Sequence, residues 1–145
     1  MSGKAYELRL SEESAGTQKL MGLAAYLMTA LERGGTVVVD ELDAKLHPKL
    51  LRYVILLFKD PEVNKSGAQL IFSSQDVSTM RNDVFRRDEI WFAARGEGEA
   101  SQLWSLADIH ESNGNLVSKN AAFDKQYLSG RYGADPYLTR IEEWD

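Results

Sequence analysis

The stretch Thr36-Val37-Val38-Val39-Asp40-Glu41-Leu42-Asp43 decides the fold of this chain, because it joins a strand pattern to a cluster of acids. Its first four residues are mostly β-branched, and Gly34-Gly35 precedes them. This pattern predicts a strand buried on both faces of a parallel sheet. Open α/β sheets place their ligands at the carboxyl ends of the strands, where one carboxylate can hold Mg²⁺ and its neighbour can polarise a water. The eight residues therefore fit a ligand site, and equally a strand followed by an acidic turn.

The composition is that of a globular protein and excludes several kinds of site. The chain has 145 residues, of which 43% are hydrophobic and 27% charged, so we expect a single domain over residues 1–145. We see neither a membrane span nor a signal peptide, and we expect a cytoplasmic protein without a membrane partner. Thiolate metal sites are excluded because there is no cysteine. The net charge of -5 argues against a duplex-binding surface over the whole domain and leaves a local basic patch open.

A helix is predicted upstream of the central strand. Its apolar positions recur at helical spacing, at Leu20, Leu23, Ala24, Leu27, Met28 and Leu31. Ser14 stands where an N-cap belongs, Gly16 lets backbone approach the helix start, and Gly34-Gly35 ends the helix. A helix start of this kind can bind an anion, or it can be an ordinary cap.

Downstream, strands and helices alternate. Pro48 begins a helix with apolar positions at Leu51, Val54, Ile55 and Phe58, and Asp60-Pro61 ends it. We expect strands over Gln69–Ser73, Glu89–Ala93 and Gln102–Leu106, a short helix over Val77–Phe85 capped by Asp76, and a hairpin turn over Arg95–Glu99. The order predicts an α/β fold, a mostly parallel sheet with helices and an antiparallel β edge.

Several motifs in this order resemble the C-terminal half of an ABC-type ATPase domain, a P-loop NTPase fold. More narrowly, the chain is similar to the AAA-labelled ATP/GTP-binding proteins related to RecF, SMC and the OLD nucleases, many of them linked to phage defence. The signature of that family is matched by Glu13-Ser14-Ala15-Gly16-Thr17, and its Walker B segment by Asp40–Asp43 with Leu46-His47-Pro48. Further matches are Ala68–Phe72, Arg86–Phe92 and Gly130–Ala134, so the resemblance runs from Glu13 to about Leu138.

The resemblance implies roles for six residues in binding and hydrolysing ATP. Asp40 would hold Mg²⁺, and Glu41 would orient or deprotonate the attacking water. Ser14, Gly16 and Thr17 would face the γ-phosphate of a nucleotide held by a second subunit, which implies a homodimer. Gln75 stands where the family usually has a histidine that senses the γ-phosphate, and it can donate a hydrogen bond but cannot carry a charge. Hydrolysis is therefore expected to be slow or differently tuned.

A second departure from the family concerns the phosphate-binding loop. The chain has no Gly-x-x-x-x-Gly-Lys-Ser/Thr stretch, the Walker A motif that holds the phosphates. We therefore expect this chain to be a fragment that carries the signature and Walker B half. Alone it is expected to be inactive as an ATPase, and it needs a Walker A half from the same protein or a separate chain. The missing strands also predict a sheet edge that is exposed or covered by a partner.

Two other functions stay open at this point. A Mg²⁺-dependent nuclease would use Asp40, Glu41 and Asp43 as metal ligands, although the sequence shows no basic groove for nucleic acid. A non-catalytic module would keep the half-fold as a dimerisation surface. The sequence does not decide whether nucleic acid is a partner or what ATP hydrolysis would drive, such as phage defence or a DNA transaction.

Overall fold

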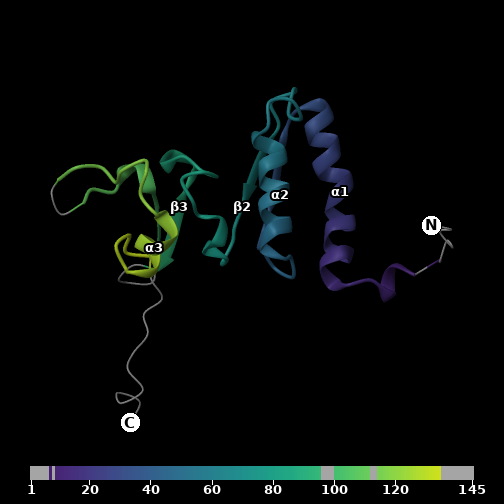
Figure 1. Ribbon diagram of the computed structural model, residues 1–145, viewed down its shortest axis with the longest axis horizontal. Helices are drawn as coiled ribbons and strands as arrows, with labels where there is room; N and C mark the ends of the chain where they lie inside the picture. The colour runs from purple at the N-terminus through teal and green to yellow at the C-terminus, as the bar shows by residue number, and fades with distance from the viewer. Residues whose placement is uncertain (1–6, 8, 96–99, 112–113, 135–145) are drawn as a thin grey trace, which may run out of the picture. The chain divides into compact units, whose positions relative to one another are not determined.

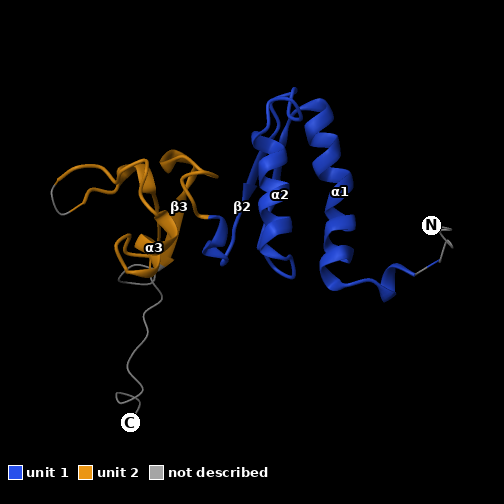
Figure 2. Cartoon of the chain, viewed as in Figure 1, with its two compact units in different colours: residues 1–79 blue, residues 80–145 orange. Residues whose placement is uncertain are grey.

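The computed structural model describes residues 7, 9–95, 100–111 and 114–134 (Figure 1). The chain divides into two compact units, Met1–Thr79 and Met80–Asp145 (Figure 2). Each unit is described by itself below, and the single domain expected over residues 1–145 stays a prediction. Among the helices in the described residues, none combines the length and apolar character that crossing a bilayer requires.

The first unit begins with the short 3-10 helix η1 (Leu10–Glu12) and the long helix α1 (Ala15–Arg33). Ser14 is the N-cap, because its side chain accepts a hydrogen bond from the backbone N–H of Thr17 at 3.1 Å. The helix ends at Gly34, whose φ is 78° and whose N–H donates to the carbonyl of Ala30 at 2.8 Å. A Cβ at Gly34 would lie 2.8 Å from the carbonyl oxygen of Ser66, so the chain needs glycine there. The predicted cap and helix end are confirmed.

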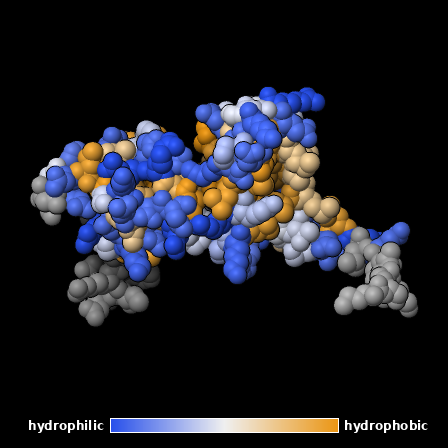
Figure 3. All heavy atoms as spheres, turned by 45° about the horizontal axis from the view of Figure 1, so that its top comes forward, coloured by the Kyte–Doolittle hydropathy of each residue, from blue (hydrophilic) through white to orange (hydrophobic). Residues whose placement is uncertain are grey.

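Strand β1 (Thr36–Val39) pairs in parallel with β2 (Gln69–Phe72), and Val38 lies opposite Ile71. The expectation that β1 is buried on both faces is wrong within this structure: Val39 is 8% exposed, but Val38 is 73% and Ile71 56% exposed. Helix α1 contacts β1 and α2 (Pro48–Lys59) contacts β2, and the alternating exposure shows that only one face of the pair is covered. Figure 3 shows hydrophobic residues, in orange, on the visible face of the molecule. These two strands pair only with each other in the described part of the chain.

Helix α2 follows the acidic turn and contributes Leu51, Val54 and Ile55 to the core of the first unit. Its N-cap is His47, whose Nδ1 accepts a hydrogen bond from the N–H of Lys49 at 3.2 Å, and Pro48 opens the first turn as predicted. The spacing of its apolar residues turns one face inward, as expected from the sequence. The buried apolar residues of this unit are Leu27, Ala30, Val39, Leu42, Leu46, Leu51, Val54, Ile55 and Ala68.

The helix predicted over Val77–Phe85 is wrong in length. Only the 3-10 helix η2 (Val77–Thr79) forms, although Asp76 caps it as predicted, accepting a hydrogen bond from the N–H of Ser78 at 2.7 Å. The segment is rich in Val, Ser, Thr, Asn and Asp. Such residues lose side-chain freedom in a helix or bond the backbone locally, so they favour turns over a longer helix.

The second unit is built on an antiparallel pair, β3 (Trp91–Arg95) and β4 (Ser101–Ser105). This pair forms a sheet of its own rather than the edge of the parallel sheet in the described residues. Strand β3 begins two residues later than predicted because residues 87–89 form the 3-10 helix η3 (Arg87–Glu89). The 3-10 helix η5 (Leu106–Asp108) and helix α3 (Phe123–Leu128) complete the unit. Of the expected hairpin turn, residues 96–99 lie outside the described residues.

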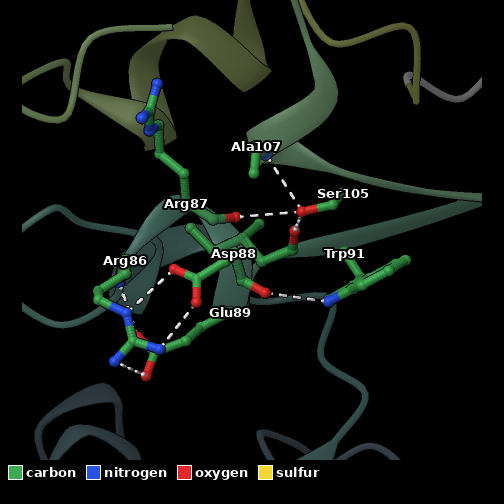
Figure 4. Close-up of polar contacts among 8 residues, drawn as sticks. Arg86, Arg87, Asp88, Glu89, Trp91, Ser105 and Ala107 are labelled. Carbon is green, nitrogen blue, oxygen red and sulfur yellow. Dashed lines mark hydrogen bonds and ion pairs between the residues drawn. The ribbon is translucent and has the colours of Figure 1, made fainter. Parts of the chain in front are cut away.

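An aromatic core closes the second unit. The ring of Phe92 stacks on Tyr127 with centroids 5.6 Å apart and lies 5.3 Å from the ring of Tyr132. The buried residues of this core cluster are Ile90, Phe92, Leu106, Val117, Phe123 and Tyr132. Around η3 the polar contacts join both neighbouring and distant residues (Figure 4): the indole of Trp91 donates to the carbonyl of Asp88 at 3.2 Å, and the hydroxyl of Ser105 donates to the carbonyl of Arg87 at 3.4 Å.

Candidate functional site

The carboxyl ends of β1 and β2 bring together Asp40, Glu41, Ser73 and Gln75. The Ser73 hydroxyl donates to Oδ1 of Asp40 and accepts from the backbone N–H of Glu41, the latter at 2.7 Å. The side-chain amide of Gln75 donates to Oε1 of Glu41 at 3.2 Å. The sequence predicted Asp40, Glu41 and Gln75 as site residues, although Gln75 lies more than thirty positions after the other two. The structure joins all three in one hydrogen-bonded group.

The turn that follows β1 has an unusual backbone. Glu41 has a φ of 48° and Lys45 a φ of 65°, the left-handed region that residues with a Cβ rarely occupy. Between them Leu42 is fully buried, and its N–H donates to the carbonyl of Ser73 at 3.0 Å. Leu42 therefore anchors the turn in the core while the side chains of Asp40 and Glu41 stay exposed. Strained backbone of this kind concentrates at functional sites.

Asp43 lies behind this exposed pair. Its Oδ2 accepts from the backbone N–H of Gln75 at 3.3 Å, and its Oδ1 is buried without a hydrogen-bond partner in the described structure. A buried carboxylate oxygen without a partner is costly and needs an explanation, such as an ion or a water. Among the described residues, no group of three or more His, Cys, Asp or Glu side chains is placed to hold a metal.

These carboxylates fit Mg²⁺ bound with few protein ligands. Mg²⁺ keeps several waters and binds proteins through one or two carboxylates together with substrate phosphates. Asp40 supplies one exposed carboxylate, and the unpartnered Oδ1 of Asp43 offers a second oxygen in the same turn. A cluster that held metal through three protein carboxylates alone would need Asp40, Glu41 and Asp43 to converge, and the described residues contain no such group.

The structure places Ser14, Gly16 and Thr17 at the start of α1, next to the same turn. The hydroxyls of Ser14 and Thr17 lie 2.9 Å apart. A Cβ at Gly16 would lie 2.6 Å from the carbonyl oxygen of Lys45, so glycine is needed here for packing inside the chain. An open pocket of about 420 Å³ lies between helix and turn, and it is lined by Ala15, Gln18, Lys19, Ala44 and Lys45.

Sequence reasoning missed two residues of this site. Ser73 binds both Asp40 and Glu41, and Lys19 donates to the carbonyl oxygens of Glu41 at 2.5 Å and Ala44 at 3.1 Å. Ser73 could have been found, since it is polar and ends a strand beside the predicted acids. Lys19 carried no such signal, because a lysine in an amphipathic helix usually faces solvent.

Comparison with known families gives one match. The family model described as "AAA domain, putative AbiEii toxin, Type IV TA system" matches residues 2–81, more than half of the chain. Comparisons with curated proteins and with solved structures give no match. The matched segment contains all six predicted site residues, and AAA domains are nucleotide-binding domains of the ATPase type. The chain therefore belongs to this family of AAA domains.

Proposed function

We propose that this chain supplies the signature and Walker B half of a Mg²⁺-dependent ATPase of the ABC type. The observation that carries the proposal is the hydrogen-bonded group of Asp40, Glu41, Ser73 and Gln75 at the carboxyl ends of two parallel strands. That edge of an open α/β sheet is where ligands bind. The setting we propose, phage defence or a DNA transaction, follows from the resemblance, and the matched family description names a toxin.

Asp40 and Glu41 divide the chemistry between them. Asp40 is exposed and would hold Mg²⁺, which neutralises charge on the phosphate oxygens when bound. Glu41 would act on the attacking water as a general base or by orienting it. Ser73 contacts the two residues differently, because its hydroxyl donates to the Asp40 carboxylate and accepts from the backbone N–H of Glu41. The Glu41 carboxylate is instead held by Gln75.

Gln75 explains why we propose slow hydrolysis. Its amide donates to the Glu41 carboxylate, so it positions the base but offers no positive charge to a γ-phosphate. Because electrostatic stabilisation of the transferred phosphoryl group is a large part of this chemistry, a neutral residue here lowers the rate.

The start of α1 would act on a second nucleotide. Ser14, Gly16 and Thr17 stand at the positive end of a 19-residue helix, which favours an anion such as a γ-phosphate. We propose that a second copy of the domain presents this phosphate, so that two sites close in a homodimer. The loop that cradles the phosphates would come from a Walker A half, which these residues do not contain.

The nuclease alternative has less support. It needs several carboxylates around metal, and the described residues place no group of three such ligands. A dimerisation module without catalysis is compatible with the fold, but such a module would not need the Gln75–Glu41 contact. That contact is the reason to prefer the ATPase.

Isothermal titration calorimetry with Mg-ATP tests the proposal. For the 145-residue chain alone we expect no binding with a Kd below roughly 1 mM, which corresponds to a binding free energy of about 4 kcal/mol. A complete domain that joins these residues to a Walker A half should bind and slowly hydrolyse Mg-ATP. Glu41→Gln in that domain should keep binding and lose hydrolysis, because it removes the base while retaining size and hydrogen bonding.

Other results would overturn the proposal. Hydrolysis unchanged by Glu41→Gln would remove Glu41 from the chemistry and favour the dimerisation module. Divalent-dependent cleavage of DNA without ATP would favour the nuclease. Tight Mg-ATP binding by the chain alone would mean that it holds the phosphates by residues other than a Walker A loop.

A further inference from the structure

Lys19 makes an unusual pair of contacts for a lysine on a helix. Its ammonium group donates to two backbone carbonyls of one turn, those of Glu41 at 2.5 Å and Ala44 at 3.1 Å. An ammonium has three donors, and bonds from a charged donor are stronger than neutral ones. The residue is half-buried, so its ammonium group contacts both the protein backbone and solvent.

Glu41 is held at three points. Its N–H donates to Ser73, its carboxylate accepts from Gln75, and its carbonyl accepts from Lys19. The same carbonyl also accepts from the N–H of Ala44 at 3.0 Å, and a carbonyl oxygen has room for both donors. Because its φ is 48°, Glu41 keeps this conformation only where the surroundings determine it. Of the three side chains that hold Glu41, Lys19 alone comes from α1.

The same face of α1 touches the far end of the turn. Gly16 lies one helical turn before Lys19, and its hydrogens pack against the carbonyl of Lys45. The first turn of α1 thus contacts both ends of the segment from Glu41 to Lys45. A displacement of this helix start would be transmitted to the backbone of Glu41.

We propose that Lys19 is a positioning residue that holds the left-handed backbone of Glu41 and couples the start of α1 to the candidate base. Its consequence for catalysis rests on the proposed function, in which Glu41 acts on water and α1 faces a γ-phosphate. An anion at the start of α1 then controls, through Lys19, where the Glu41 carboxylate lies. The coupling itself is a property of the folded chain and can be measured without nucleotide.

Amide hydrogen exchange on the full chain measures this coupling directly. In Lys19→Met, which keeps the length of the side chain and removes its charge, we expect the amides of Leu42, Ala44 and Leu46 to exchange about tenfold faster. Amides of the α2 core should exchange at the wild-type rate. Lys19→Arg should restore most of the protection, because a guanidinium also donates to carbonyls. Lys65→Met, a change at an exposed loop lysine of the same unit, is the control and should leave exchange unchanged.

Three results would overturn the inference: unchanged exchange in Lys19→Met, equal acceleration throughout the first unit, or failure of Lys19→Arg to restore protection. Hydrolysis in the complete domain adds a functional test. There Lys19→Met should lower kcat about tenfold or more with little change in KM, and Lys19→Arg should recover it. If the wild-type domain hydrolyses no ATP, the proposed function fails, while the exchange experiment still decides the coupling.

Discussion

The two units of this chain use their charged and polar side chains differently. In the second unit the charged pairs are local: Arg81 bonds Asp83 at 3.0 Å and Arg86 bonds Asp88 at 2.8 Å. In the first unit Lys19 and Ser73 reach Glu41 from 22 and 32 positions away. The second unit has an aromatic core, and both units leave apolar side chains of their strands exposed: Val38 and Ile71 in the first, Trp91 and Leu103 in the second. Long-range polar contacts occur in both units, since Arg87 donates to the carbonyl of Val117 in the second, but in the first unit they converge on Glu41 of the candidate site.

The largest expected effect tests whether apolar packing holds the second unit. Phe123 is 1% exposed, so Phe123→Ala should lower the free energy of unfolding by about 3–5 kcal/mol. Urea denaturation followed by tryptophan fluorescence measures this loss. Leu128→Ala, on the same helix but 70% exposed, is the matched control and should have little effect. Equal losses in the two variants would show that the packing described for this core does not determine stability.

A smaller effect tests the close contact between α1 and the turn in the first unit. Gly16→Ala should lower the free energy of unfolding by about 1–3 kcal/mol, because its Cβ would lie 2.6 Å from backbone. Gly22→Ala is the control: a Cβ there meets nothing within 4 Å, and alanine should stabilise the helix by about 0.5–1 kcal/mol. Urea denaturation should thus show a lower free energy of unfolding for Gly16→Ala and a higher one for Gly22→Ala, although both are glycine-to-alanine changes in one helix. The same sign for both would contradict the contact.

The pH dependence of the second unit sharpens the contrast further. Burial raises the pKa of the Tyr132 phenol from 10.0 to about 12. The unfolded chain therefore releases this proton first, and stability that is complete below pH 10 falls as the pH rises towards 12. Tyr132→Phe removes the phenol, so its urea midpoint should fall less steeply than that of wild type over this range. Parallel curves for the two proteins would place Tyr132 outside the core.

The smallest effect is expected at the exposed charges of the second unit. The hydrogen bond to Asp88 (Figure 4) is the largest of the causes that raise the pKa of Arg86, yet both side chains are well exposed to solvent. Solvent screens such pairs. Arg86→Gln should leave the urea midpoint within the reproducibility of the measurement. A clear loss of stability would show that solvent does not screen this exposed pair.

The sequence was sufficient where a local pattern determines the structure. The β-branched run of β1, the apolar face of α2 and the Ser14 cap each depend on neighbouring residues, and all three are present. The meeting of Asp40, Glu41 and Gln75 was also predictable, because the carboxyl ends of parallel strands share one edge. The helix over Val77–Phe85 was overestimated, because weak helix formers outweighed a good cap.

The remaining features depend on contacts between distant segments. Lys19 meets backbone carbonyls, which every residue has, so no spacing or residue type identifies its partner. The left-handed backbone of Glu41 is imposed by Ser73, Lys19 and the burial of Leu42. Local preference alone would place glycine or asparagine there.

The positive φ of Glu41 has a consequence for how this position would change under selection. Glycine occupies the left-handed region without a steric penalty, so folding alone would favour Glu41→Gly. A library of variants selected only for thermal stability should therefore lose the glutamate at position 41 early. A library selected for hydrolysis in the complete domain should keep it. The residue at this position thus records which of the two pressures, stability or activity, has governed the chain.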